Sequence, residues 1–171
     1  QVGRVYIRIT SSLPILDVVL LQGEATSSTP NPSIVYNSAT GKLAVCIANS
    51  DNTSIASKVD FGVTIVQNTK YYIDWSFNLS AATWSMKAKL NGANEGSTTS
   101  AQSADTINAV RFGHTGIIGP AHTTHWGDLV LSVTAGDYGI GAGGTQVRVG
   151  NADGTSVPGT NVMEDNAGTD I

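Results

Sequence analysis

Apolar and polar residues alternate with a period of two along most of this chain, and no segment shows the helical period of 3.6 residues over ten residues or more. Residues 4–10 are a clear case, because Val5, Ile7 and Ile9 fall on one face while Tyr6 and Arg8 fall on the other. The alternation predicts a chain of β-strands with essentially no helix.

Similar runs recur to the end of the alternating region, and two pairs of them are joined by short turns. Segments with a strand pattern are 4–10, 15–22, 33–37, 42–49, 61–66, 71–80, 85–92, 107–114 and 125–134. We predict one hairpin from 33–37 and 42–49, in which Gly41 supplies the positive φ of the turn, and a second from 61–66 and 71–80. Nine or ten short strands, with turn signals about every 8 to 12 residues, predict an all-β, two-sheet antiparallel sandwich.

The same pattern predicts which side chains fill the space between the sheets. We expect these residues to be largely buried: Val5, Ile7, Ile9, Val45, Ile47, Val63, Ile65, Ile73, Trp75, Val110, Phe112, Leu129 and Leu131.

Three segments have few apolar side chains and break the alternation. Residues 23–32 and 93–106 are predicted to be loops. From residue 136 onward the chain is rich in glycine, and only 145–151 (TQVRVGN) keeps a strand pattern. We therefore expect a sandwich domain over residues 1–135, followed over 136–171 by an extended tail or linker to a following module.

Composition narrows the class of partner. Only 13% of residues are charged, against roughly 25% in an average soluble protein, and the net charge is −4. Single, scattered cations argue against nucleic acid, and the lack of an 18-residue apolar run argues against a membrane span. The lone Cys46 lies in an apolar run and is predicted to be a core residue. Gln1 in place of Met favours a processed or excised fragment.

The order of motifs resembles a known superfamily. Residues 70–92 (KYYIDWSFNLSAATWSMKAKLNG), 107–116 (INAVRFGHTG) and 125–134 (HWGDLVLSVT) are similar to successive strands of laminin-G-like, concanavalin A-like jelly-roll domains. The opening RVYIRITSSLP and the exit TAGDYGIGAGG resemble those of bacteriophage and prophage structural proteins. The resemblance spans Arg4 to about Asn151 and implies a jelly-roll sandwich with a glycine-rich C-terminal extension.

Candidate chemistry is sparse. Glycoside hydrolysis needs two carboxyl groups facing one bond, and no strand carries acids at i and i+2 or i+4, so we expect no enzyme. His122 and His125 have the spacing HTTH, with His114 nearby, but three residues on a loop do not direct two imidazoles to one zinc ion.

Calcium is the better metal candidate. The resemblance implies a cation at the start of the last strand, where Asp128 matches the second acid of the family's acidic pair and Gly127 replaces the first. Calcium takes six to eight oxygen ligands, so Asp128 would need help from carbonyl groups and water. The alternative is an Asp that caps backbone amides at the strand entrance.

Aromatic residues raise the question of sugar binding. Trp75 follows the strand alternation and is predicted to fill the core, whereas Trp84 and Trp126 flank turns and are candidates for half-exposed stacking faces. They are the candidate carbohydrate-binding residues.

These observations favour a non-enzymatic structural and interaction module of a phage-like virion: a capsid decoration, head fibre or tail-associated protein. Its expected partners are other virion proteins or copies of itself as a homo-oligomer, with surface glycans as a further ligand. The alternative is a free-standing carbohydrate-binding module of a secreted bacterial protein.

Overall fold

Ten β-strands make up the described part of the chain, which in this computed structural model comprises residues 1–26, 30–48, 55–113, 123–132 and 138. The strands are β1 (Val2–Ile9), β2 (Val18–Ala25), β3 (Asn31–Asn37), β4 (Lys42–Ala48), β5 (Ile55–Phe61), β6 (Tyr71–Asn78), β7 (Thr83–Leu90), β8 (Ala93–Ala101), β9 (Ile107–Phe112) and β10 (Thr124–Ser132). No helix occurs among the described residues, and none of them forms a segment that would cross a membrane as a helix.

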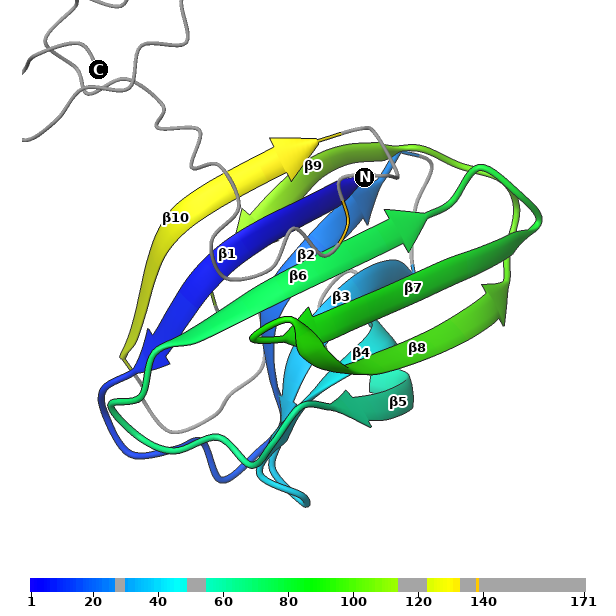
Figure 1. The fold of residues 1–171 in the computed structure, drawn as a ribbon. Coiled ribbons are helices and arrows are strands. Elements are labelled where there is room, and N and C mark those ends of the chain that lie inside the picture. Colours follow the sequence, from blue (N-terminus) through cyan, green and yellow to red (C-terminus); the bar gives the residue numbers. More distant parts are fainter. Residues whose placement is uncertain (27–29, 49–54, 114–122, 133–137, 139–171) are drawn as a thin grey trace, which may run out of the picture.

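The strands form two antiparallel five-stranded sheets that face each other. Sheet A has the order β10-β1-β6-β7-β8, and sheet B has the order β5-β4-β3-β2-β9. Figure 1 shows sheet A in front of sheet B, with β10 (yellow) and β9 at one side and β8 and β5 at the other. The predicted all-β, two-sheet antiparallel sandwich is confirmed.

The core lies between the sheets and follows from the strand alternation. On β1 the side chains of Val5, Ile7 and Ile9 are buried, and Trp75 and Phe77 of β6 are fully enclosed beside them. Gly3 provides the room for the Trp75 indole, because a Cβ at Gly3 would lie 2.2 Å from a ring carbon of Trp75. The prediction that Trp75 fills the core is confirmed.

The predicted hairpin of residues 33–49 is also confirmed, as strands β3 and β4. They pair from Asn31↔Ala48 to Asn37↔Lys42. Gly41 has a φ of 67° and its amide donates to the carbonyl oxygen of Asn37, which closes the turn.

The second predicted hairpin is wrong. The strand before β6 is β5 in sheet B, not residues 61–66, and the chain crosses from sheet B to sheet A between Phe61 and Tyr71. Gly62 turns the chain there with a φ of 73°, and a Cβ at that position would lie 2.6 Å from Leu90. Val63 is therefore exposed, contrary to the prediction, whereas Ile65 is buried.

Residues 93–106 were expected to be a loop, and this is wrong for Ala93–Ala101, which form β8. The strand is polar because it lies at the edge of sheet A, and its stability comes from backbone pairing with β7 and close packing on β5. Gly96 permits that packing, since a Cβ there would lie 2.8 Å from the Cβ of Phe61. The predicted loop at 23–32 is shorter than expected, as β2 continues to Ala25 and β3 begins at Asn31.

Strand β2 likewise starts later than predicted, at Val18. Ile15 and Leu16 precede it and are exposed, while Asp17 accepts hydrogen bonds from Ser38.

Strand β10 corrects the predicted core in another way. Leu129 and Leu131 are 39% and 48% exposed, because β10 is the edge strand of sheet A. Val110 and Phe112 on the edge strand β9 are only partly buried, although they pack against the core. The tail over 139–171, including the predicted strand at 145–151, lies outside the described residues, as do His114 and His122.

Candidate functional site

Asp128, the candidate calcium ligand, lies in a β-bulge of the edge strand. Arg4 pairs with Val130 and Tyr6 pairs with Gly127, so two residues of β10 face one residue of β1 between them. Asp128 has a φ of 53°, the left-handed conformation of a bulge residue. Gly127 is needed beside it, because a Cβ there would lie 2.7 Å from the ring of Tyr6.

The carboxylate of Asp128 already has partners within the protein. Its Oδ2 accepts from the Lys70 ammonium at 3.4 Å and from the Tyr72 hydroxyl at 3.3 Å. The hydrogen bond to Tyr72, and a weaker one to Asp128, raise the pKa of Lys70. Lys70 also lies 4.2 Å from the centre of the Tyr6 ring.

This surrounding does not fit calcium. Calcium requires more oxygen ligands than one carboxylate supplies, and the Lys70 ammonium group, 3.4 Å from that carboxylate, opposes the charge of the ion. Among the described residues no three His, Cys, Asp or Glu side chains come together as a metal site.

The two candidate stacking tryptophans differ in exposure. Trp84 is only 3% exposed and its indole donates to the carbonyl oxygen of Ser103 at 2.8 Å, so it offers no face to a sugar. The expectation of a half-exposed ring is wrong for Trp84, because its face packs into the core cluster. Trp126 is partly buried and meets Phe112 edge to face at 5.5 Å.

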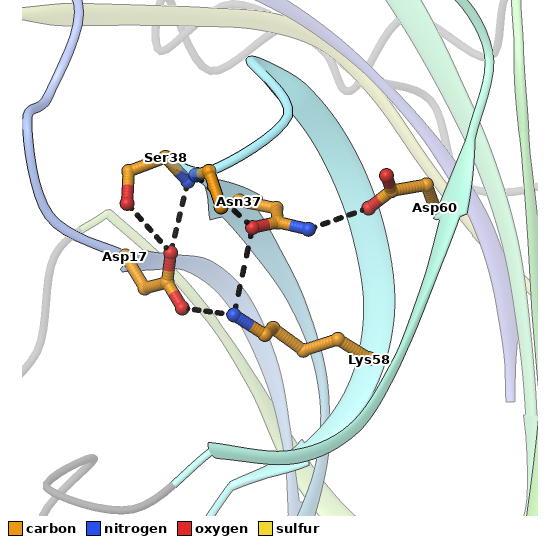
Figure 2. A network of polar contacts seen from close by, with 6 residues as sticks. Asp17, Asn37, Ser38, Lys58 and Asp60 are labelled. Carbon is orange, nitrogen blue, oxygen red and sulfur yellow. Dashed lines mark hydrogen bonds and ion pairs between the residues drawn. The ribbon is translucent and has the colours of Figure 1, made fainter.

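A polar network across sheet B was not predicted from the sequence. Figure 2 shows Asp17 and Lys58 reaching each other across the end of the β3–β4 hairpin. Asn37 accepts from Lys58 at 3.5 Å and donates to Asp60 at 2.8 Å. Burial raises the pKa of the Asp17 carboxyl, but the hydrogen bonds from Lys58 and Ser38 outweigh it and lower the pKa overall.

The network lies beside a small apolar cluster on the outer side of sheet B, formed by Val35, Ala44 and Cys46. Burial raises the pKa of the Cys46 thiol to about 12. The charges of Lys58 and Asp17 have smaller effects on this pKa: Lys58 lowers it and Asp17 raises it. Cys46 is thus buried, as its apolar run predicts, although it lies on the outer side of sheet B and not between the two sheets.

The outer face of sheet A holds a second unpredicted group. Arg4 and Asp74 are paired across β1 and β6, and Arg4 Nε donates to Asp74 Oδ1 at 2.9 Å. Although both side chains point away from the core, Arg4 is 8% exposed and Asp74 is 1% exposed. Tyr138 lies over the same face of sheet A, and burial, the hydrogen bond to Glu95 and the charge of Asp74 raise the pKa of its hydroxyl.

Tyr138 is held by three charged side chains. Its hydroxyl donates to Glu95 Oε2 at 2.8 Å, and its ring centre lies 4.3 Å from Lys87 Nζ and 4.8 Å from Lys89 Nζ. We call Lys87, Lys89 and Glu95 the tyrosine clamp. In the sequence, only one feature could have pointed to Tyr138: it is a single aromatic residue in a glycine-rich run.

Comparison with models of known protein families finds no match, and comparison with curated proteins finds no matching relative. The structure itself defines the class of the described residues as an all-β sandwich of two five-stranded antiparallel sheets.

Proposed function

We propose that the chain is a non-enzymatic structural and interaction module of a phage-like virion, with the concanavalin A-like jelly-roll arrangement that its sequence resembles. Its place would be that of a capsid decoration, head fibre or tail-associated protein. Its partners would be other virion proteins or copies of itself.

The observation that carries the proposal is the exposure of leucine side chains on β10, at the long side of the sandwich where the edge strands β9 and β10 lie. Leu131 pairs with Gly3, whose missing side chain would point at Trp75, so Leu131 is on the core-facing side of β10. Leu129 and Leu131 are nevertheless exposed. A core-facing leucine in contact with water, with a second exposed leucine two residues before it, favours a surface that a neighbouring protein covers.

On the opposite long side of the sandwich, the two edge strands are in contact with each other. There β5 packs on β8, and the amide of Gly62 donates to the carbonyl oxygen of Asn94 at 3.0 Å. An assembly contact is therefore expected at β9 and β10.

The distribution of charge supports association. Arg4, Lys58 and Lys89 each have a carboxylate partner. With 13% charged residues in the chain, a neighbour would approach without desolvating many unpaired ions, which is the costly step in burying charge.

Quantitative mass spectrometry of purified particles tests the proposal directly. We expect the chain in a fixed copy number per particle, and we expect Leu129→Ser with Leu131→Ser to lower incorporation strongly. Val63→Ser with Val66→Ser is the matched control, because it changes two exposed valines in the segment between β5 and β6. The absence of the chain from particles, or equal incorporation of both double variants, would contradict the proposal.

The tail is the second element of the proposed assembly. Removal of residues 137–171 is expected to leave the sandwich folded, since its last strand ends at Ser132, but to abolish incorporation or self-association. If the truncated chain assembles as well as the intact chain does, the tail has no such role.

A carbohydrate-binding module of a secreted bacterial protein is the alternative, and one observation favours it: Trp126 stays partly accessible on β10. Affinity electrophoresis in soluble polysaccharides separates the two. Retardation that is lost in Trp126→Ala would support this alternative.

A further inference from the structure

Strand β8 is an edge of sheet A, and only one side of its backbone is paired with β7 (Figure 1). The amide of Gln102 donates to the carbonyl oxygen of Ala82 at 2.9 Å, and residues of an antiparallel strand point alternately towards and away from the partner strand. The residues whose backbone faces β7 are therefore Gly96, Thr98 and Ser100. Those whose amides and carbonyl groups point away from the sheet are Ser97, Thr99 and Ala101.

This outward edge is regular and uncharged from Gly96 to Ala101. Its sequence is GSTTSA, and every residue of it pairs in register with β7. The bulge of β8 comes earlier, at Asn94, which has a φ of 53° and whose carbonyl oxygen is bonded to Gly62. Six residues of edge thus remain without an interruption.

The other edge strands carry features that hinder pairing with a further strand. Strand β10 has the bulge and the charge of Asp128, and β5 has Lys58 next to Ser57, whose φ is 55°. On β9, Asn108 is an extra residue in the pairing with β2. Because bulges and charges keep edge strands from pairing, β8 is the edge of the two described sheets that is best suited to it.

An exposed valine beside this edge points to a covering partner. Val59 on β5 pairs with the core residue Val45, so its side chain is on the core-facing side of sheet B, yet it is 38% exposed. The carbonyl oxygen of Val59 would lie 3.2 Å from a Cβ at Gly96, where the free edge begins. A strand added beside β8 would reduce the contact of this valine with water.

The side chains of the free edge favour an identical strand as that partner. Ser97, Thr99 and Ala101 are small and exposed, and they are spaced symmetrically about Thr99. Two antiparallel copies centred on this residue place Thr99 opposite Thr99 and Ser97 opposite Ala101. All outward-pointing backbone groups of the stretch are then paired, and no like charges face each other.

We propose that two copies of this chain associate by antiparallel pairing of their β8 strands, which joins the two A sheets into one continuous sheet about a two-fold axis. The inference rests on the proposed function, because it names a copy of the chain as one partner. It adds a contact on the long side opposite to Leu129 and Leu131.

A charge exchange at Thr99 tests the pairing. Thr99→Lys and Thr99→Glu each place like charges opposite each other, so each variant alone should associate about tenfold more weakly than the wild type, or less, in sedimentation velocity. An equimolar mixture of the two places opposite charges together and should associate again. Ser85→Lys is the matched control, because Ser85 is exposed and lies opposite Thr99 on β7, one strand inside the edge. It should associate as the wild type does.

Cross-linking keeps the test informative where association is weak. Thr99→Cys should form a disulfide-linked dimer under mild oxidation, because hydrogen-bonded antiparallel residues have Cα atoms about 5.5 Å apart, which suits a disulfide. Ser85→Cys is the control and should stay monomeric, and the native Cys46 is buried. Circular dichroism checks that each variant is folded.

The pairing is wrong if the mixture of Thr99→Lys and Thr99→Glu associates no better than either variant alone, or if Thr99→Cys cross-links no faster than Ser85→Cys. Particles that contain the chain would still support the proposed function in that case. Conversely, pairing in solution without the chain in particles would remove the proposed function alone.

Discussion

Gly3 matters for stability because it has no side chain. A methyl group there would overlap the Trp75 ring at 2.2 Å, whereas at Gly23, also in a strand, the nearest atom would be 3.1 Å away. We predict that Gly3→Ala lowers the free energy of unfolding by about 1 to 3 kcal/mol, the usual cost of overpacking. Gly23→Ala should cost clearly less in the same urea titration, and equal losses would contradict this account.

Asp128 yields a prediction about metals. Its carboxylate is bonded to Lys70 and Tyr72, so we expect the melting temperature to be the same with and without a calcium chelator. A ligand that binds only the folded state raises its stability, so a drop on chelation would show a calcium site that this geometry does not provide.

At the scale of elements, the contact between Asp17 and Lys58 ties the start of β2 to the edge strand β5. The lowered pKa of Asp17 means that the unfolded chain binds the proton more tightly, so this contribution to stability is full above the ordinary value of 3.8 and is lost as pH falls below it. We predict that acid unfolding between about pH 4 and pH 2 is less steep in Asp17→Asn than in the wild type.

The same substitution should also cost about 1 to 2 kcal/mol at pH 7, because Ser38 and Lys58 lose a charged acceptor. Lys58→Gln serves as a graded control, since it keeps the carboxyl group and its bonds to Ser38. Parallel acid titrations of all three proteins would contradict the assignment.

Strand alternation was sufficient to predict β1, the β3–β4 hairpin and the buried Trp75. It failed at the edges, where strands are held by backbone pairing: β8 has few apolar side chains, and β10 exposes Leu129 and Leu131. The partner of Asp128 was not predictable, because Lys70 is brought to it by the pairing of β10, β1 and β6. Tyr138 was missed because contacts across a whole sheet leave no periodic signal.

For the whole molecule, the clamp predicts how the tail and the sandwich depend on each other. A chain ending at Tyr138 keeps the clamp occupied, while a chain ending at Gly136 does not. We predict that the shorter chain is less stable by about 1 to 2 kcal/mol, because it loses the Glu95 hydrogen bond and the two lysine contacts. Thermal unfolding of the two truncated proteins measures this, and identical melting temperatures would mean that Tyr138 adds nothing to the isolated domain.

The rate at which Cys46 reacts with a thiol reagent would measure opening motions of the molecule. It is the single cysteine, it is fully buried, and burial raises its thiol pKa to about 12, so a thiol reagent at pH 8 meets neither an exposed nor an ionised sulfur. Labelling should therefore proceed only when the cover of Cys46 on the outer side of sheet B opens. Its rate would report the frequency of that opening in the native protein, and the dependence of that rate on urea would distinguish a local fluctuation at β4 from separation of the whole sandwich.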